Sequence, residues 1–451
     1  MIRTDSRKIK PGDTFVALDG INSNGDAYIE KAIEAGAALI VCREGQYRVQ
    51  TLNVPDPSAY LEKALKQEYG GIIDKMTLIA VTGTNGKTTT CNLIADALNA
   101  CGIKCGYIGT NGFYLGEKIQ DLPNTSVALA DLYDLLLTAH SRGFDTIALE
   151  ASSQGLAEGR LNTILFDAAV FTNLTEDHLD YHKTMGRYAL AKQAVFRQLK
   201  NDGWAVINAD SEYSYCFLLQ ENRNIQYGID DGDVRITEFS FAGESSFTYS
   251  AFGRAYKVRT KLLGRHNMYN ILAAICVLNG LGIEFEKINS VIENLNAPEG
   301  RCDCIQYKGA TIVVDYAHTP DAVSNIIECA GEFTDGKMYV VFGCTGDRER
   351  EKRPVMTRIV LSSCEYAIIT DDDVHNESED QIIEDMLRGN EYKNYEICTD
   401  RKAAVHKGID LLREGDTLLI LGKGHEKFII MKDWKIPYND KEAVLEYIQG
   451  I

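Results

Sequence analysis

The sequence has no long apolar run and a deficit of positive charge. No segment approaches the roughly 18 consecutive apolar residues of a membrane-spanning helix, so we expect no membrane insertion. The first residues, MIRTDSRKIKPGD, lack the apolar core of a signal peptide, which favours a cytoplasmic location. Lys and Arg number 47 against 65 Asp and Glu, a net charge of −18. That balance excludes a general nucleic-acid surface, because counterion release needs clustered cations.

Cysteines are sparse, at 12 in 451 residues, so they cannot form a disulfide scaffold. Cys302 and Cys304 are spaced C-x-C, and Cys101 and Cys105 are spaced C-x3-C. Neither pair is followed by a second Cys/His pair at zinc-site spacing. We therefore interpret the cysteines as small buried hydrophobic residues in a reducing compartment.

Short apolar runs alternate with amphipathic stretches along most of the chain. A strand is predicted at 77–83 (TLIAVTG) and a helix at 88–102 (TTTCNLIADALNACG). Further buried strands are predicted at 145–152, 167–174 and 203–210, which indicates an α/β protein with a mostly parallel sheet and helices on both faces. The pattern of predicted strands and helices changes near residues 75 and 299. Before 75, FVALDG and ALIVC read as strands around a helical EKAIEAG; after 299, strand–helix alternation resumes. These changes predict domains at 1–75, 76–299 and 300–451.

The most informative stretch is VTGTNGKTTT (81–90), which follows a strand and opens a helix. Gly83 and Gly86 allow the backbone to approach phosphate closely, and the amides at the helix start then face the anion. Lys87 is placed to neutralise the β- and γ-phosphates, and the Thr88 hydroxyl to bind Mg²⁺. Val81 stands where the first Gly of G-x4-G-K-[ST] belongs. The stretch predicts a shortened phosphate-binding loop.

This loop resembles that of the Mur ligases, the ATP-dependent amide ligases of peptidoglycan precursor assembly. DSRKIKPGDTFVALDG (5–20) is similar to the nucleotide-sugar domain of the members that add the third residue of the peptide. Further motifs follow in the family's order: EASSQGLAEGR (150–160), FTNLTEDHLDYH (171–182), YALAKQAVF (188–196), GRHNMYN (264–270), PEGR (298–301), DYAHTPDA (315–322), 342–356 and GKGHE (422–426). The resemblance implies a central P-loop-type ATPase domain between an N-terminal nucleotide-sugar domain and a C-terminal Rossmann-like α/β domain.

The resemblance also implies the chemistry and its cofactors, ATP and Mg²⁺. ATP phosphorylates a substrate carboxylate, and an amine then attacks the acyl phosphate. The catalytic positions it assigns are Lys87, Glu150, His178 and Lys192. The Mg²⁺ ligands that it implies are Thr88, Glu150, His178 and Lys192, with Lys192 as a carbamate. We interpret His182 as a structural residue. The ATP positions are Gly83, Thr84, Asn85, Gly86, Lys87, Thr88, Thr89, Asn267, Asn270, Arg301, Asp315 and His318.

The substrates that the resemblance implies are UDP-MurNAc-L-Ala-D-Glu and an amino acid. The nucleotide-sugar positions are Ser6, Thr125, Ser126, Ser152, Glu158 and Arg160; at 125–127 this chain has Thr-Ser-Val where the family has Thr-Thr-Pro. The amino-acid positions are Arg348, Asp372, Asp373, His375, Gly422 and Glu426. We expect a monomer whose domains close over ATP.

The identity of the amino acid depends on one short stretch. Members that use meso-diaminopimelate carry Asp-Asn-Pro-Arg, whose Arg binds the distal carboxylate; here the residues are Asp372, Asp373, Val374 and His375. Exchanging Arg and Asn for His and Asp favours a distal ammonium. We therefore expect L-lysine, with L-ornithine next and meso-diaminopimelate as the alternative.

Three other functions compete with this reading. Folylpolyglutamate synthetases share the central domain but lack a DSRKIKPGD unit. A P-loop kinase has no need of the HNMYN, PEGR and DYAHTPD series. An idle nucleotide-binding scaffold would be expected to lack at least one of Lys87, Glu150, His178 and Lys192, and all four are present.

Overall fold

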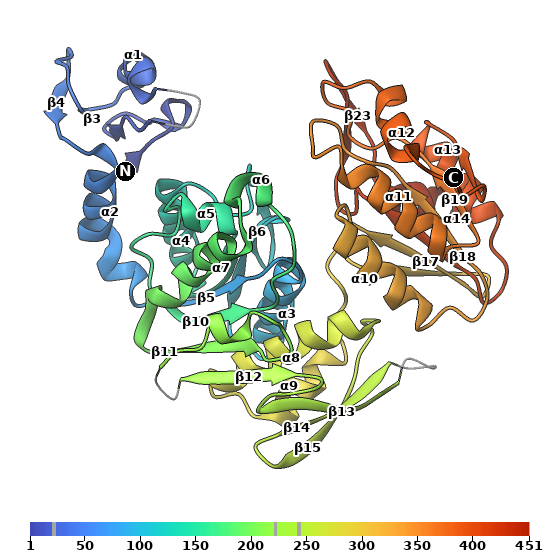
Figure 1. Cartoon of the computed structure of the whole chain (residues 1–451). Helices are drawn as coiled ribbons and strands as arrows, with labels where there is room; N and C mark the ends of the chain where they lie inside the picture. The colour runs from blue at the N-terminus through green and yellow to red at the C-terminus, as the bar shows by residue number, and fades with distance from the viewer. Residues whose placement is uncertain (20–23, 221–222, 241–244, 451) are drawn as a thin grey trace.

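The computed structural model describes residues 1–19, 24–220, 223–240 and 245–450. Gly20, the last residue of the FVALDG run, lies outside this set. Three successive α/β units each contain their own sheet, coloured blue, cyan to yellow, and orange to red in Figure 1. The three-domain α/β fold predicted from the sequence is thereby confirmed. No helix in the described part of the chain combines the length and apolarity needed to cross a membrane.

The N-terminal unit contains a four-stranded parallel sheet in the order β1-β2-β3-β4. Its strands are β1 (Ile2–Arg3), β2 (Thr14–Val16), β3 (Leu39–Cys42) and β4 (Gln50–Asn53), and its helices are α1 (Ile29–Glu34) and α2 (Pro57–Ile73). Helix α2 begins at an Asp56 cap with Pro57 at its first position, an arrangement that suits a helix start. It leads into the central unit.

The central unit is built on an eleven-stranded sheet in the order β15-β14-β13-β12-β11-β10-β5-β9-β6-β7-β8. The strands are β5 (Thr77–Thr82), β6 (Cys105–Gly109), β7 (Gly112–Leu115), β8 (Glu117–Gln120), β9 (Thr146–Glu150), β10 (Phe166–Phe171), β11 (Leu199–Asn208), β12 (Asn224–Gly228), β13 (Val234–Ser240), β14 (Ser246–Ala251) and β15 (Arg254–Arg259). The helices are α3 (Lys87–Ala100), α4 (Leu129–Ser141), α5 (Ser153–Ala157), α6 (Leu179–His182), α7 (Met185–Gln193), α8 (Arg265–Gly280) and α9 (Phe285–Ile292).

The middle of strand β5, residues 78–81, is continuously apolar because helices cover both faces of the sheet around it. Leu78 and Ala80 pack in one core with α2 and α4, whereas Ile79 and Val81 pack in a second core with α3 and α8. Two-sided burial of a parallel strand produces this kind of continuous apolar run. It places the carboxyl end of β5, where the phosphate loop begins, in the middle of the sheet.

Both edges of the central sheet are antiparallel, a feature that the sequence prediction of a mostly parallel sheet did not contain. Strands β6, β7 and β8 form one meander, and β13, β14 and β15 form the other. Phe252 and Gly253 connect β14 to β15 with φ angles of 48° and 80°, which suits a tight two-residue hairpin. Such short connections require antiparallel pairing.

The C-terminal unit has a six-stranded sheet in the order β16-β17-β21-β18-β19-β20, parallel except for β16. Its strands are β16 (Asp303–Tyr307), β17 (Ala310–Asp315), β18 (Met338–Phe342), β19 (Tyr366–Ile369), β20 (Tyr395–Ile397) and β21 (Thr417–Leu421), with a separate hairpin of β22 (Phe428–Ile430) and β23 (Lys435–Pro437). Its helices are α10 (Pro320–Gly331), α11 (Lys352–Ser363), α12 (Glu379–Leu387), α13 (Arg401–Asp410) and α14 (Asp440–Gln449).

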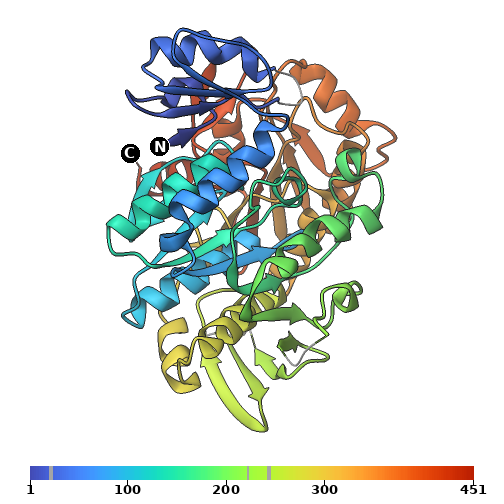
Figure 2. The same cartoon turned by 90° about the vertical axis from the view of Figure 1, so that its left-hand side faces the viewer.

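Polar contacts connect the three units. Lys8 of the N-terminal unit pairs with Asp131 of α4 at 2.7 Å. Asn85, in the loop between β5 and α3, donates to Asp321 in the first turn of α10 at 2.6 Å. Because Asn85 belongs to the phosphate loop, the Asn85–Asp321 contact places this loop at the boundary with the C-terminal unit. The turned view in Figure 2 shows the N-terminal unit at the top, with the central unit extending below it.

Candidate functional site

The phosphate loop is held tightly between β5 and α3. Gly83 and Gly86 have φ angles of 152° and 84°. A Cβ atom at Gly83 would lie 1.9 Å from the hydroxyl oxygen of Thr172, and one at Gly86 would lie 2.5 Å from the amide oxygen of Asn270. The Lys87 ammonium donates to the carbonyl of Gly83 at 2.9 Å. Only glycine fits both positions, so the backbone amides are free of side-chain cover.

Neighbouring side chains fix the rest of the loop. The Asn85 amide donates to the side-chain oxygen of Asn173 at 2.9 Å, and the Thr84 hydroxyl lies 3.2 Å from the Tyr188 hydroxyl. Asn173 follows β10 and Tyr188 lies in α7. The sequence interpretation selected other residues in these two segments, His178 and Lys192, but neither of these partners. These partners define the shape of the loop before any phosphate arrives.

Glu150 lies at the carboxyl end of β9, opposite Val81 of β5 in the parallel register. Its carboxylate is buried and accepts from the Tyr107 hydroxyl at 2.5 Å and from the Thr110 amide at 3.0 Å. Thr88, also buried, lies in the first turn of α3. An oriented carboxylate and a hydroxyl at the carboxyl edge of a parallel sheet are suitable oxygen ligands for Mg²⁺. Thr89, the last loop residue predicted to contact ATP, is also buried in this turn of α3.

Lys192 is almost completely buried, with 1% of its surface exposed. Its ammonium donates to the Gly83 carbonyl at 2.6 Å and lies 4.5 Å from the centre of the Tyr188 ring. Burial, with a smaller contribution from Lys87, holds the pKa of Lys192 well below its usual range. Lys192 therefore lies in α7 with its ammonium against the phosphate loop, whereas a lysine in a short amphipathic helix is usually exposed.

His178 has a left-handed backbone (φ 52°) and precedes α6. Its backbone amide donates to Asp177 at 2.9 Å, and its side chain is exposed. Asp177 also pairs with Lys352 of α11 at 3.2 Å, which adds a second contact between the central and C-terminal units. His182 is buried and hydrogen bonded to Ser153 at 3.0 Å, a structural arrangement.

Two asparagines in the first turns of α8, Asn267 and Asn270, contact each other, and Asn270 also contacts the phosphate-loop helix. Asn270 accepts from the Thr90 hydroxyl at 3.2 Å and donates to Asn267 at 3.1 Å. Asn267 in turn donates to the Leu263 carbonyl at 2.8 Å. The sequence left open whether these residues cap α8 or contact adenine; no side-chain cap is formed at the α8 start.

Arg301 lies in the linker between the central and C-terminal units. The centre of its guanidinium group is 4.7 Å from the centre of the Tyr316 ring, and its buried Nε has no hydrogen-bond partner among the described residues. The His318 ring packs edge-on against the same tyrosine. An unpartnered buried donor of this kind is suited to an anionic ligand.

Asp315 fixes the linker itself. Its two carboxylate oxygens accept from the backbone amides of Cys302 and Ala317, each at 2.7 Å. Burial raises the pKa of Asp315, while nearby Arg301 opposes that shift. Both oxygens are used inside the protein, where they hold the backbone at Cys302 and Ala317.

The predicted nucleotide-sugar residues form a cluster beside Glu150. The Ser126 hydroxyl donates to the Glu150 carbonyl at 3.0 Å and receives the Ser152 amide at 3.0 Å. Arg160 donates to the Ser126 carbonyl at 2.8 Å and pairs with Glu158 at 2.5 Å. The remaining position in the cluster, Thr125, lies 3.0 Å from Thr110, a Glu150 partner. Ser6 is buried in the separate N-terminal unit.

The predicted amino-acid residues gather around a lysine that the sequence interpretation did not select. Lys423 is fully buried and donates to Asp373 at 2.7 Å and to Glu426 at 2.6 Å; Asp372 lies 3.6 Å away. A Cβ atom at Gly422 would lie 2.4 Å from Asp372. In the sequence, Lys423 lies between the two glycines of the GKGHE motif. This position could have identified it as a candidate site residue.

Two further amino-acid positions lie outside this cluster. Arg348 is exposed in the loop after β18, without a hydrogen bond or ion pair to any residue that the structure describes. His375 follows the β19 loop with a left-handed backbone (φ 51°). Asp321 and Lys352, which join the two units, are functional candidates that the sequence interpretation also missed.

A phosphate loop, a strand-end carboxylate and a boundary shared with a second α/β unit define a nucleotide-using enzyme. The chain matches the family models described as Mur ligase family, catalytic domain (1–69), Mur ligase middle domain (81–278) and Mur ligase, glutamate ligase domain (300–424).

Similar proteins support the same assignment. UDP-N-acetylmuramoyl-L-alanyl-D-glutamate–2,6-diaminopimelate ligases of Aquifex aeolicus and Bacillus cereus are 37% and 35% identical, covering 100% of this chain and 93% and 94% of theirs. A solved structure with the same protein name has a TM-score of 0.71 and 29% identity, covering 100% of this chain and 94% of its own. The chain belongs to the Mur ligase family, and is an ATP-dependent amide ligase of peptidoglycan synthesis.

Proposed function

We propose that this ligase adds a diamino acid to UDP-MurNAc-L-Ala-D-Glu, with ATP and Mg²⁺, as a cytoplasmic monomer. One observation carries the proposal: Glu150 joins the phosphate loop to the hydroxyl cluster. Its side chain lies at the loop edge of the sheet, and its carbonyl accepts from Ser126 at 3.0 Å. A phosphoryl donor and a substrate bound at these two places would meet at Glu150.

The three units would divide the ligands between them. Residues 1–75, with Ser6, would hold part of the nucleotide-sugar; residues 76–299 would hold ATP; residues 300–451 would hold the amino acid. The contact between Asn85 and Asp321 at 2.6 Å supports the meeting of the last two. This division of the ligands assumes the predicted domain boundaries near residues 75 and 299.

The proposed reaction has two steps, and the first gathers negative charge that the site must compensate. A substrate carboxylate oxygen attacks the γ-phosphorus and ADP leaves; the amine nitrogen then attacks the acyl carbon, losing a proton, and phosphate leaves. Lys87 and Arg301 are placed to compensate the negative charge that gathers during transfer. Burial lowers the pKa of Lys87, and the carboxylates of Glu150 and Asp177 oppose that shift.

Mg²⁺ fits the donors at this edge of the sheet. Glu150 and Thr88 offer oxygen atoms, and the exposed imidazole of His178 offers a nitrogen. A neutral amine is the form of lysine that adds CO₂, and burial favours it at Lys192. We infer that Lys192 is carbamylated and supplies a further anionic oxygen. The metal would neutralise phosphate charge.

For the amino acid, the relatives favour meso-diaminopimelate over the L-lysine expected from the sequence, because that substrate is in their names. The structure weakens the argument for lysine. That argument rested on two changes, the absence of the distal arginine at His375 and the extra acid, Asp373. The second ground loses force, because the Asp373 carboxylate accepts from Lys423 at 2.7 Å and from the Ile430 amide at 2.7 Å. Exposed Arg348 remains available for a substrate carboxylate. We therefore propose meso-diaminopimelate, with L-lysine and L-ornithine as competitors.

A product assay tests this choice. Purified protein receives ATP, Mg²⁺, UDP-MurNAc-L-Ala-D-Glu and each amino acid separately, and the amide product is followed by mass spectrometry. We expect the highest kcat/KM with meso-diaminopimelate. A higher value with lysine or ornithine would reverse the assignment, and no amide product with any of them would contradict the proposed ligase reaction.

A further inference from the structure

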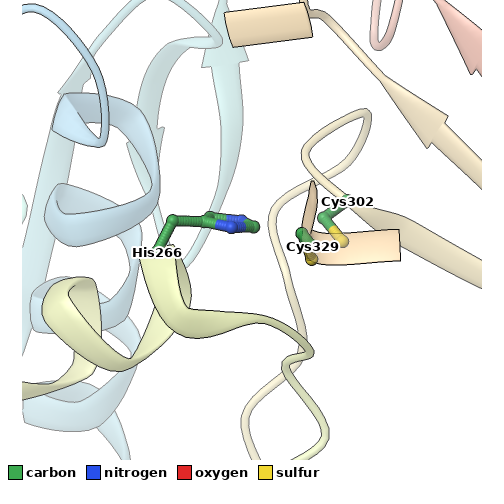
Figure 3. Close-up of side chains that lie close together, drawn as sticks. All are labelled: His266, Cys302 and Cys329. Carbon is green, nitrogen blue, oxygen red and sulfur yellow. The ribbon is translucent and has the colours of Figure 1, made fainter. Parts of the chain in front are cut away.

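A buried group of soft metal ligands lies where α8, the interdomain linker and α10 meet. His266 comes from the first turn of α8, Cys302 follows the linker Arg301, and Cys329 lies near the end of α10. One ring nitrogen and the two sulfur atoms are all within 4.8 Å of one another. Figure 3 shows the imidazole of His266 directed across the boundary toward both sulfur atoms.

The backbone around the group is shaped to bring the sulfurs there. Cys302 has a left-handed backbone, φ 49°, which is unfavourable for a residue with a side chain, and Asp315 holds its amide at 2.7 Å. Gly264, just before α8, has φ 88°, and a Cβ atom there would lie 2.1 Å from the Cys329 sulfur. The sulfur thus occupies space that another residue's side chain would fill.

Ligand type and spacing suit a zinc-class cation. Tetrahedral zinc has Zn–S bonds of about 2.3 Å, so two bound sulfurs lie about 3.8 Å apart. The present group, whose ligand atoms all lie within 4.8 Å of one another, is compatible with that spacing. Cys302 and Cys329 are 4% and 3% exposed, whereas His266 is half-buried, so one side of the group can be reached by an ion or a water.

Cys302 and Cys329 place two buried sulfur atoms close together at the boundary between the units. Two adjacent buried thiolates would need a cation to compensate their charge. The nearby Cys304 thiol donates to the Cys302 carbonyl at 3.4 Å.

We propose that His266, Cys302 and Cys329 form a binding site for a zinc-class divalent cation, with water as the fourth ligand. The ion would cross-link the two units beside the ATP site, since Asn267 follows one ligand and Arg301 precedes another. It would hold α10 against α8 and stabilise the closed arrangement of the domains.

Cobalt provides a direct test, because thiolate ligands give Co²⁺ a charge-transfer band that an oxygen-liganded Mg²⁺ site does not. The full chain is reduced, stripped with a chelator and titrated with Co²⁺, then with Zn²⁺. We expect one equivalent with the thiolate band, displaced by Zn²⁺. Cys302→Ser, Cys329→Ser and His266→Asn should lose or alter this band, while Cys398→Ser, at a cysteine elsewhere in the same unit, should retain it.

Measurements on the unmutated protein keep the test valid if a variant misfolds. Zn²⁺ should raise the Tm and protect two thiols from alkylation. A protein that binds no stoichiometric Co²⁺, or shows an unchanged band in Cys329→Ser, would overturn the proposal. So would a Cys302–Cys329 disulfide whose reduction fails to restore Co²⁺ binding.

Discussion

The ammonium group of Lys192 lies against the Tyr188 ring and donates to the Gly83 carbonyl at 2.6 Å. In the described part of the chain no carboxylate forms an ion pair with it. A lysine buried in this way is easier to deprotonate, because low dielectric surroundings disfavour the charged form. Its chemistry therefore depends on packing around α7 and the phosphate loop.

Lys192→Gln should reduce kcat by about a hundredfold, a typical effect of removing one electrostatic contact to a transition state. Glutamine keeps a hydrogen-bond donor but cannot add CO₂. The assay is amide formation at saturating ATP, with Lys183→Gln, an exposed lysine nearby, as the control. Full activity in Lys192→Gln would contradict the role of this side chain in metal binding.

Asp371 provides a test of pH dependence at the same scale. Burial and nearby Glu379 raise its pKa to about 7. In the unfolded chain an aspartate has a pKa of about 3.9, so between roughly pH 4 and 7 the native state holds a proton that the unfolded state releases. This group therefore lowers the free energy of unfolding as pH rises through that window.

Asp371→Asn should remove that loss, raising the free energy of unfolding relative to the parent at about pH 8 but much less at about pH 4. Urea unfolding of both proteins at each pH gives the comparison. Exposed Asp202→Asn is the control and should give no such pH-dependent difference. An equal effect of Asp371→Asn at both pH values would rule out this titration.

At the scale of elements, the phosphate loop joins three of them at very short range. Gly86 begins α3 and faces Asn270 of α8, and Gly83 faces Thr172 after β10. These contacts connect phosphate binding to the helix that holds the predicted adenine contacts. The loop can change little without moving α8.

Gly86→Ala should raise the KM for ATP by at least about tenfold, since even a 1 Å misplacement of a site can cost much of its activity. Gly102→Ala is a matched control: its φ is 91°, but its Cβ would contact nothing within 4 Å. Both changes should lower stability by roughly 1–2 kcal/mol through their left-handed backbones. ATP kinetics that are equally affected in both variants would exclude a specific role for the Asn270 contact.

At the scale of the whole molecule, polar contacts join the central and C-terminal units beside the packing of α8 against α10. Asp321 accepts from Asn85 at 2.6 Å and from Thr175 at 3.1 Å, and Lys352 pairs with Asp177 at 3.2 Å. Contacts of this kind can be broken and formed again during turnover, which suits a cleft that admits ATP and releases ADP.

Asp321→Ala should shift the protein toward an open arrangement by about tenfold, because a hydrogen bond to a charged group contributes about 1.5–3 kcal/mol. Small-angle scattering of the ligand-free protein should show a larger radius of gyration. Glu328→Ala, an exposed residue in the same helix, should not. Identical profiles for all three proteins would show that Asp321 does not control closure.

Charge also has to be considered at this scale. The net charge of −18 describes an acidic exterior, yet both proposed large substrates are polyanions. Lys87, Arg160 and Arg301 lie at the phosphate loop, the hydroxyl cluster and the linker. Local cations and helix starts can attract an anion that the whole surface repels.

The sequence by itself determined the α/β class, the phosphate loop and the family, because strand periodicity and the order of motifs are written in consecutive residues. It also selected Glu150, Ser126 and Ser152, which the structure places together. It did not reveal that Lys423 pairs with Asp373, which weakens the argument for lysine, or that Asp315 holds the linker. Nor did it bring His266, Cys302 and Cys329 together. These relations join residues that are far apart in the chain, and only the packing of α8, α10 and the C-terminal sheet decides their distances, burial and charge.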